Sequence, residues 1–133
     1  MRIEVDELWS FLGEKQQVWW VWLALDSRTR QVVAMMARER DAFTARCLWK
    51  SLQSTYRERT IAATDLLPVY QAIIPERWHA TGEKEMGLTA NVERFFGTLR
   101  QRCARKTLSF SRKMENHVGA LWYFIRQYNL CRA

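Results

Sequence analysis

Alternating side chains at the start of the chain predict a β-strand. Over residues 2–9, Ile3 and Val5 fall on one face, as the two-residue period of a strand requires. Glu4 and Asp6 fall on the other face. The predicted strand therefore has one apolar side and one acidic side.

Two further apolar runs predict a hairpin beside this strand. Residues 18–25 form a continuous run rich in Val and Trp, short enough for a strand that is buried on both faces. A polar turn at residues 26–30 separates it from a second apolar run at residues 31–37. We therefore expect the first three strands to form an antiparallel sheet.

The period then changes to that of a helix, which a fourth strand follows. Apolar residues after Asp41 recur at helical spacing, and Asp41 itself is a plausible N-cap. These residues are Phe43, Cys47, Leu48, Leu52 and Tyr56. Residues 60–64, Thr-Ile-Ala-Ala-Thr, are strand-like and end directly at Asp65. A helix between two strands predicts a parallel crossover connection.

Two amphipathic helices are expected in the last third of the chain. The first carries one apolar stripe, made by Val92, Phe95, Phe96, Leu99 and Cys103. The second carries another, made by Met114, Val118, Leu121, Trp122, Ile125 and Tyr128, after Ser111 as candidate N-cap. The whole pattern predicts an α/β fold, a mixed sheet flanked by helices.

Length and composition restrict the class of protein. A chain of 133 residues with 48% hydrophobic residues fits a single domain, residues 1–133, around a hydrophobic core. The longest apolar run, residues 18–25, is far shorter than a membrane helix. No signal peptide follows Met1, so we expect a cytoplasmic protein without membrane contact. The three cysteines lie far apart, without the spacing of a zinc site.

Positive charge is concentrated in the C-terminal part of the chain. Residues 94–133 hold nine Lys or Arg residues and one acid, whereas the preceding residues hold twelve basic and thirteen acidic ones. A basic end of this kind favours a polyanion such as DNA as its partner. The alternative is a solvated basic face that keeps the protein in solution, and charge alone does not decide between the two.

Three acids are candidates for a catalytic or metal-binding role. Asp6 lies inside the first strand, Asp65 at the C-terminal end of a predicted parallel strand, and Glu93 beside the apolar stripe of a helix. Each has an ordinary explanation, respectively an edge-strand acid facing water, the N-cap of a turn and a first-turn helix acid. Brought together, three carboxylates would repel unless a cation neutralised them, and magnesium is the oxygen-ligated cation of phosphate chemistry.

Several motifs occur in the order of a known family. Residues 5–11, Val-Asp-Glu-Leu-Trp-Ser-Phe, resemble the opening catalytic motif of the InsB-type transposases, which belong to the first-described family of bacterial insertion sequences. Thr64-Asp65, followed five residues later by Tyr70, looks like the second motif of that family. Residues 91–94 with 98–102 resemble the third motif, and residues 105–111 resemble its basic signature. The resemblance covers nearly the whole chain.

This resemblance implies a ribonuclease-H-like fold and the chemistry of a DDE transposase, which hydrolyses DNA phosphodiester bonds and transfers the freed strand to a target. It assigns Asp6, Asp65 and Glu93 to an acidic triad that holds two Mg²⁺ ions, with Mn²⁺ as a substitute. The implied partners are double-stranded DNA, at transposon ends and target, and an upstream zinc-binding and helix-turn-helix region or further copies of the chain.

Basic residues near and after the third acid are the candidates for DNA contacts. Arg100 lies seven residues after Glu93, so the two fall on nearly the same face of a helix. The proposed phosphate contacts are Arg94, Arg100, Arg102, Arg105 and Lys106. Contacts of this kind carry no information about DNA sequence.

Two other functions share part of the pattern. In a non-catalytic DNA-binding remnant or partner subunit of a transposase, the basic helices would hold DNA and the acids would only decorate the fold. A ribonuclease acting on RNA–DNA hybrids would share the fold and the metal ions. Stabilisation by magnesium or manganese distinguishes an active triad from a binding module, which would show salt dependence only.

Overall fold

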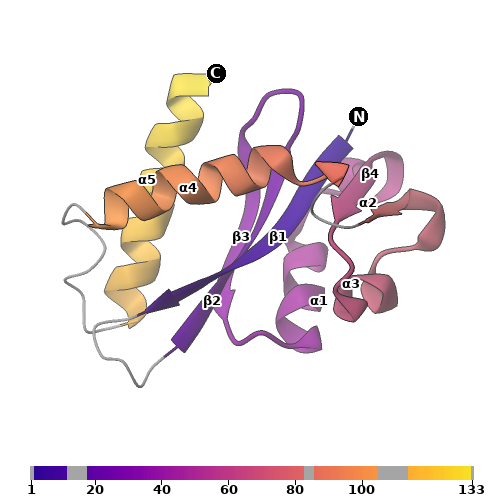
Figure 1. The fold of residues 1–133 in the computed structure, drawn as a ribbon, viewed down its shortest axis with the longest axis horizontal. Coiled ribbons are helices and arrows are strands. Elements are labelled where there is room, and N and C mark those ends of the chain that lie inside the picture. Colours follow the sequence, from indigo (N-terminus) through magenta and orange to yellow (C-terminus); the bar gives the residue numbers. More distant parts are fainter. Residues whose placement is uncertain (1, 12–17, 83–85, 105–113, 133) are drawn as a thin grey trace.

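A five-stranded mixed sheet forms the centre of the protein (Figure 1). This computed structural model describes residues 2–11, 18–82, 86–104 and 114–132. The strands are β1 (Arg2–Phe11), β2 (Val18–Asp26), β3 (Val32–Arg38), β4 (Ile61–Thr64) and β5 (His79–Thr81). Their order across the sheet is β3-β2-β1-β4-β5, which places β1 in the middle.

The strand directions agree with the prediction. β2 pairs antiparallel with both β1 and β3, which confirms the predicted arrangement of the first three strands. β4 pairs parallel with β1, with Glu4 opposite Ala63, which confirms the crossover connection. β5 runs parallel to β4 and has no counterpart among the predicted elements.

Helices cover both faces of the sheet. They are α1 (Ala42–Ser51), α2 (Ser54–Arg59), α3 (Pro68–Ile73), the 3-10 helix η1 (Glu76–Trp78), α4 (Ala90–Ala104) and α5 (Met114–Arg132). Ile3 and Val5 of β1 join the core with α1 and α3, whereas Leu8 joins the core with α4 and α5. None of the helices in the described ranges is both long and apolar enough to cross a lipid bilayer.

The acidic side of β1 is buried. Glu4 is 0% exposed and Asp6 is 3% exposed. Since β2 and β4 flank β1 on its two sides, the interpretation of Asp6 as an edge-strand acid facing water is wrong. Strand alternation places both residues on the side of Leu8, toward α4.

α1 begins where the sequence indicates and ends earlier than predicted. Asp41 accepts a hydrogen bond from the backbone N–H of Thr44 at 2.8 Å, which confirms the N-cap. The helical pattern predicted through Tyr56 is interrupted at Leu52, whose backbone is extended. Leu52 stays buried in the core, so periodic burial continues while the helix itself stops. α2 begins just after it, at Ser54.

The two C-terminal helices pack mainly through the predicted stripes. The buried stripe residues of α4 are Val92, Phe95, Phe96 and Leu99. In α5, Leu121 and Ile125 are buried, and the ring of Tyr128 lies 4.8 Å from that of Phe95. Trp122 is 47% exposed and therefore lies outside the buried part of its stripe. Ser111 and the side chains of Cys103, Met114 and Val118 lie outside the described residues.

α5 also closes one edge of the sheet. The side-chain amide of Asn129 accepts a hydrogen bond from the N–H of Val32 at 2.8 Å and donates one to the carbonyl oxygen of Val32 at 3.0 Å. Gln31 donates its side-chain amide to the carbonyl oxygen of Asn129 at 3.2 Å. Because β3 is an edge strand, Asn129 satisfies backbone groups that a neighbouring strand would otherwise satisfy.

Candidate metal centre

The parallel pairing of β1 and β4 brings two of the predicted acids together. Glu4 lies opposite Ala63 in this register, so Asp6 and Asp65 stand at the same level of neighbouring chain segments. Asp65 directly follows the last residue of β4, which confirms its predicted place at the C-terminal end of a parallel strand. Ligands of open α/β sheets collect at this kind of position.

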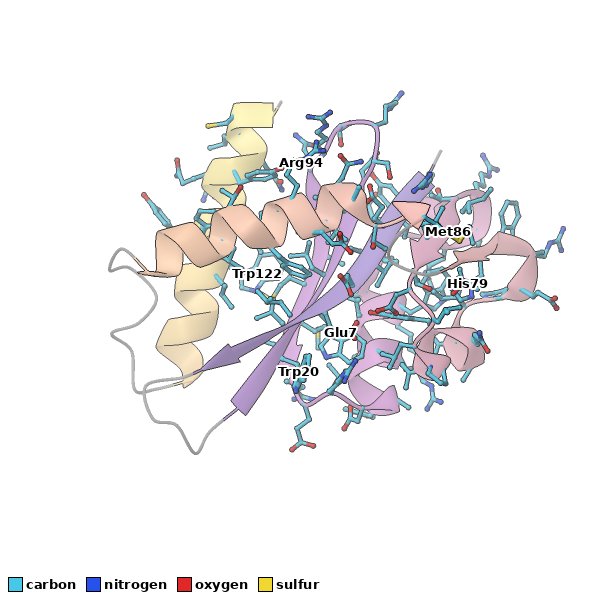
Figure 2. All side chains as sticks on the ribbon, viewed as in Figure 1. Glu7, Trp20, His79, Met86, Arg94 and Trp122 are labelled. Carbon is cyan, nitrogen blue, oxygen red and sulfur yellow. The ribbon has the colours of Figure 1, made fainter. Side chains whose placement is uncertain are left out.

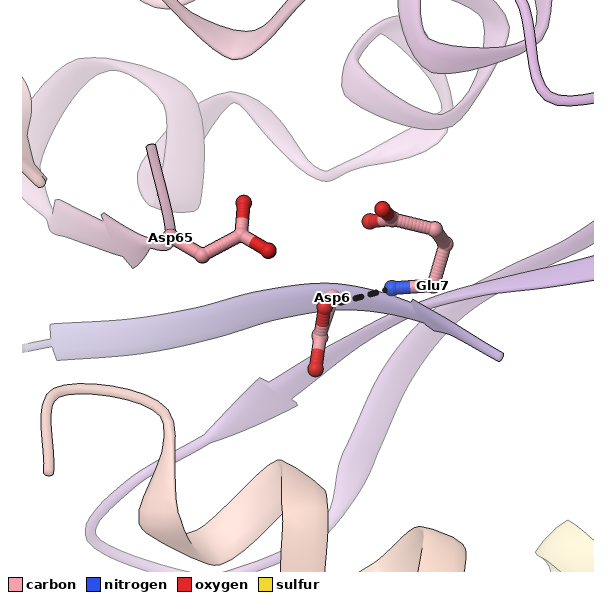
Figure 3. Close-up of side chains that lie close together, drawn as sticks. All are labelled: Asp6, Glu7 and Asp65. Atoms are coloured by element: carbon pink, nitrogen blue, oxygen red, sulfur yellow. Dashed lines mark hydrogen bonds between the residues drawn. The ribbon is translucent and has the colours of Figure 1, made fainter. Parts of the chain in front are cut away.

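A third carboxylate, that of Glu7, joins the two aspartates. One ligand oxygen from each of Asp6, Glu7 and Asp65 lies within 4.8 Å of the others, and this group is called here the carboxylate cluster. Figure 3 shows the side chains of Glu7 and Asp65 pointing toward each other on one side of β1, and that of Asp6 on the other side. Among the described residues, no other group of three possible metal ligands is as close.

Hydrogen bonds from Leu67 and Thr81 fix Asp65. Its Oδ1 accepts a hydrogen bond from the N–H of Leu67 at 3.0 Å, in agreement with the turn-capping explanation. Its carbonyl oxygen accepts one from the hydroxyl of Thr81 at 2.7 Å, which ties it to β5. The hydroxyl of Thr64 lies 2.6 Å from Nε2 of His79, and burial lowers the pKa of His79. The end of β4 is thereby held from two sides.

Glu7 is held by two residues from distant parts of the chain. Its Oε1 pairs with Nη2 of Arg40 at 3.0 Å, and its Oε2 accepts a hydrogen bond from the hydroxyl of Tyr70. The side chain of Glu7 is 2% exposed. Burial raises the pKa of Glu7, and the charge of Asp65 adds to this, whereas the bonds from Tyr70 and Arg40 act in the opposite direction. Burial and the charge of Glu7 raise the pKa of Tyr70, which keeps its hydroxyl protonated as a donor.

Asp6 is fixed by its own strand. Its Oδ1 accepts a hydrogen bond from the backbone N–H of Glu7 at 2.9 Å (Figure 3). With 3% exposure, its carboxylate is largely removed from water. A buried carboxylate beside two others is electrostatically unfavourable unless a positive charge compensates it.

Glu93 is not a member of the carboxylate cluster. It lies in the first turn of α4, half-buried, and its Oε1 accepts a hydrogen bond from the hydroxyl of Thr89 at 3.1 Å. The structure therefore brings Asp6 and Asp65 together within ligand distance and does not bring Glu93 into the same group. The predicted role of Glu93 as a metal ligand stays a prediction.

Glu4 docks α4 onto β1 close to Glu93. Its Oε1 accepts hydrogen bonds from the backbone N–H groups of Asn91 at 2.8 Å and Val92 at 3.4 Å. Its Oε2 accepts from the side-chain amide of Asn91 and from the hydroxyl of Ser27, both at 2.8 Å. The negative charge thus meets the positive end of the helix dipole. Strand alternation predicts Glu4 on the acidic side of β1, but no motif indicates a role for it.

The predicted DNA contacts are only partly described. Arg94 is exposed on α4 (Figure 2). The side chains of Arg100 and Arg102, and the whole of Arg105 and Lys106, lie outside the described residues. Their role in binding phosphates stays a prediction.

The donor atoms of the carboxylate cluster suit a hard divalent cation. All three ligands are carboxylate oxygens, which magnesium, manganese and calcium prefer over the sulfur and nitrogen donors typical of zinc sites. Of the basic side chains in the described ranges, Arg40 pairs with Glu7, and a cation would compensate the remaining repulsion between the carboxylates. The residues present therefore fit a magnesium or manganese site.

Reasoning from the sequence missed Glu7, Tyr70 and Arg40 as parts of this site. Glu7 lies inside the motif at residues 5–11, but strand alternation alone separates it from Asp6. Tyr70 follows Asp65 at the spacing of the second motif, which was a usable signal. Nothing in the local pattern around Arg40 indicated its pairing with β1.

Comparison with known proteins gives a consistent result. The profile of a family described as IS1 transposase matches residues 1–130. The chain is 34% identical over 128 residues to the insertion element iso-IS1n protein InsB of Shigella dysenteriae, with 94% of both chains covered. It is 33% identical over 125 residues to the insertion element IS1 protein InsB of Shigella flexneri, with 92% of both covered. The insertion element IS1 9 protein InsB of Escherichia coli (strain K12) is also 33% identical, with 72% of that protein covered. No solved structure matches the chain.

Proposed function

The chain belongs to the IS1 transposase family, and from this premise we propose that it is the catalytic domain of a DNA transposase. Family membership confirms the resemblance inferred from the motifs. The proposed activity is metal-dependent hydrolysis of DNA phosphodiester bonds and transfer of the freed strand to target DNA, which moves an insertion sequence.

The observation that carries the proposal is the meeting of Asp6 and Asp65 just beyond the paired part of β1 and β4. Sequence motifs select these two residues independently of the structure, and the fold then places their oxygens within 4.8 Å. Two carboxylates at this distance repel each other, which destabilises the fold, but together they supply oxygen ligands for a cation.

The sheet supports a ribonuclease-H-like fold as the scaffold. The resemblance implies a mixed sheet with three antiparallel strands first, and the order β3-β2-β1-β4-β5 with a parallel β1–β4 pair agrees with that expectation. In such a sheet the central strand and its parallel neighbour carry the two aspartates.

Asp6, Asp65 and Glu93 are the proposed ligands of magnesium, with manganese as a substitute and two ions as the expected number. When bound, these ions would activate an attacking oxygen and stabilise the leaving oxygen of the phosphodiester. The chain itself orients the carboxylates, since the N–H of Leu67 fixes Asp65 and the Glu4–Asn91 bonds fix the start of α4.

Basic side chains supply the DNA contacts in this proposal. Arg94 is exposed and lies two residues after Val92, whose N–H is bonded to Glu4. Further positive charge follows in the sequence at Arg100, Arg102, Arg105 and Lys106. Binding of this kind depends on salt and carries no sequence specificity. Recognition of particular transposon ends is therefore assigned to an upstream DNA-binding region or to assembly with other copies.

Strand transfer of a pre-nicked DNA end into plasmid tests the proposal. We expect joining that depends on magnesium or manganese and falls by at least about a hundredfold in Asp65→Asn. Asp41→Asn is the matched control, because Asp41 also accepts a backbone N–H but lies outside the cluster. Absence of joining by the wild type, even with the upstream DNA-binding region supplied, would contradict the proposal.

A second function is favoured by the separation of Glu93 from the carboxylate cluster. A non-catalytic DNA-binding subunit needs no complete triad and would use the basic residues alone. Such a protein would bind DNA in a salt-dependent manner and gain no thermal stability from manganese. A melting curve with and without manganese separates the two functions.

A further inference from the structure

We propose that Glu7 is a further ligand of the cation at the carboxylate cluster and that Arg40 and Tyr70 hold it in position. This inference rests on the proposed function, which supplies the cation. It adds to Asp6, Asp65 and Glu93 a residue that the motif comparison did not select.

The position of Glu7 is the first argument. Its carboxylate lies within 4.8 Å of ligand oxygens from both aspartates, whereas Glu93 is outside this group. Figure 3 shows Glu7 and Asp65 reaching toward each other on the same side of β1. A cation between these two side chains would therefore lie close to both Asp65 and Glu7.

The bonding of Glu7 is the second argument. Arg40 donates to its Oε1 and Tyr70 donates to its Oε2, so each oxygen accepts one of these two bonds. A carboxylate has about four lone-pair positions, which leaves capacity for a cation on either oxygen. The two partners therefore orient the group without saturating it.

The partners of Glu7 are themselves braced by aromatic rings. The guanidinium of Arg40 lies over the ring of Trp20, 4.5 Å from its centroid. The ring of Tyr70 meets that of Trp22 edge-on at 5.9 Å, and Trp22 donates its indole N–H to the backbone at 3.1 Å. A carboxylate held by two braced donors keeps its direction, which is what a metal ligand requires.

The balance of charge is the third argument. Three carboxylates lie close together, and within the described part of the chain Arg40 is the basic side chain seen to pair with Glu7. A purely structural role for Glu7, as acceptor for Arg40 and Tyr70, needs no second and third carboxylate beside it. A divalent cation accounts for all three at once.

Manganese binding to the full chain, measured by titration calorimetry and by electron paramagnetic resonance of free Mn²⁺, tests this inference without any activity assay. We expect Glu7→Gln to weaken manganese binding at least about tenfold. Glu39→Gln is the matched control. It makes the same chemical change at Glu39, an exposed residue next to Arg40 that lies outside the cluster. It should bind manganese as the wild type does.

Tyr70→Phe provides a second variant that keeps the ring and removes only the hydroxyl. Loss of one of the two bonds that orient Glu7 should weaken manganese binding by about threefold or more. This variant also decides the question if Glu7→Gln does not fold, as judged by circular dichroism. Wild-type affinity in a folded Tyr70→Phe would then overturn the inference.

The outcomes separate this inference from the proposed function. If Asp65→Asn abolishes manganese binding and Glu7→Gln retains it, Glu7 is not a ligand and the proposed function stands. If the wild type binds no manganese at all, both fail. If Glu7→Gln and Asp65→Asn both lose affinity while Glu39→Gln does not, the inference holds.

Discussion

The two halves of strand β1 bury carboxylates in different ways. Glu4, in the first half, accepts four hydrogen bonds from uncharged donors on Asn91, Val92 and Ser27. Glu7, in the second half, is bound by Arg40 and Tyr70 and lies beside two more carboxylates. Both side chains are almost completely buried.

This difference shows that burial alone does not assign a role to an acid. Hydrogen-bond donors around Glu4, including two at a helix N-terminus, satisfy a single negative charge and join α4 to the sheet. Glu7 instead lies beside the carboxylates of Asp6 and Asp65, so negative charge is concentrated there. The first arrangement supports the fold, and the second is suited to a cation.

Removal of the Glu4 carboxylate should lower the stability of the folded protein more than the other substitutions at or near β1. Glu4→Ala leaves buried donors of Asn91 and Val92 without an acceptor, and each such donor costs about 1–3 kcal/mol. We expect a loss of about 3 kcal/mol or more in the free energy of unfolding. Urea denaturation followed by circular dichroism measures it. Glu4→Gln, which keeps one acceptor oxygen, should lose less, and equal losses would contradict the role of the hydrogen bonds.

Ser27 offers a milder test of the same end of β1. Ser27→Ala removes one hydrogen bond to Oε2 of Glu4 and leaves the bonds from Asn91. We expect the free energy of unfolding to fall by about 1 kcal/mol and the manganese affinity to stay unchanged. Calorimetric titration with manganese is the control, and weakened binding would show that the two halves of β1 are coupled.

Asp65→Asn should change the stability of the metal-free protein less than Glu4→Ala or Ser27→Ala does. Asn keeps the oxygen that accepts from Leu67 and removes a charge that opposes Glu7. We expect a free energy of unfolding within about 1 kcal/mol of wild type, or higher, while metal binding is lost. Urea denaturation without metal checks this. Strong destabilisation would mean that Asp65 is structural, like Glu4.

Asp41, an N-cap outside both halves of β1, should give the smallest effect, one that disappears in acid. The bond from the N–H of Thr44 lowers the pKa of Asp41, so its carboxylate stabilises the folded state at neutral pH. That contribution is present above the ordinary pKa of the group and is lost as pH falls through the lowered one, below about pH 4. Melting temperatures of wild type and Asp41→Asn should therefore converge in this range, because Asn caps without titrating. Parallel curves would contradict this assignment.

Much of the sheet could be predicted because burial follows strand periodicity. Alternation over residues 2–9 indicated β1, and continuous apolar runs indicated the hairpin of β2 and β3. β5 could not be predicted, because three residues carry no periodic signal and its pairing depends on β4. The end of α1 was also missed, because Leu52 remains buried after the helix stops and so continues the apolar pattern.

The candidate site was predictable only in part. Asp6 and Asp65 could be selected because motifs mark them and because the predicted parallel crossover places Asp65 at the end of a parallel strand. Glu7 was not selected, because its contribution depends on Tyr70 and Arg40, which reach it only through the fold. The placement of Glu93 depends on how α4 docks, which Glu4 determines through contacts that no local pattern encodes.

The amide of Asn129 has a consequence for self-association. An edge strand with free backbone groups can add a strand from another copy and begin a growing intermolecular sheet. At Val32 both backbone groups are already bonded to one side chain, so such growth is blocked there. A single amide, placed by the last helix, thus keeps one position of this edge strand from pairing with a strand of another copy.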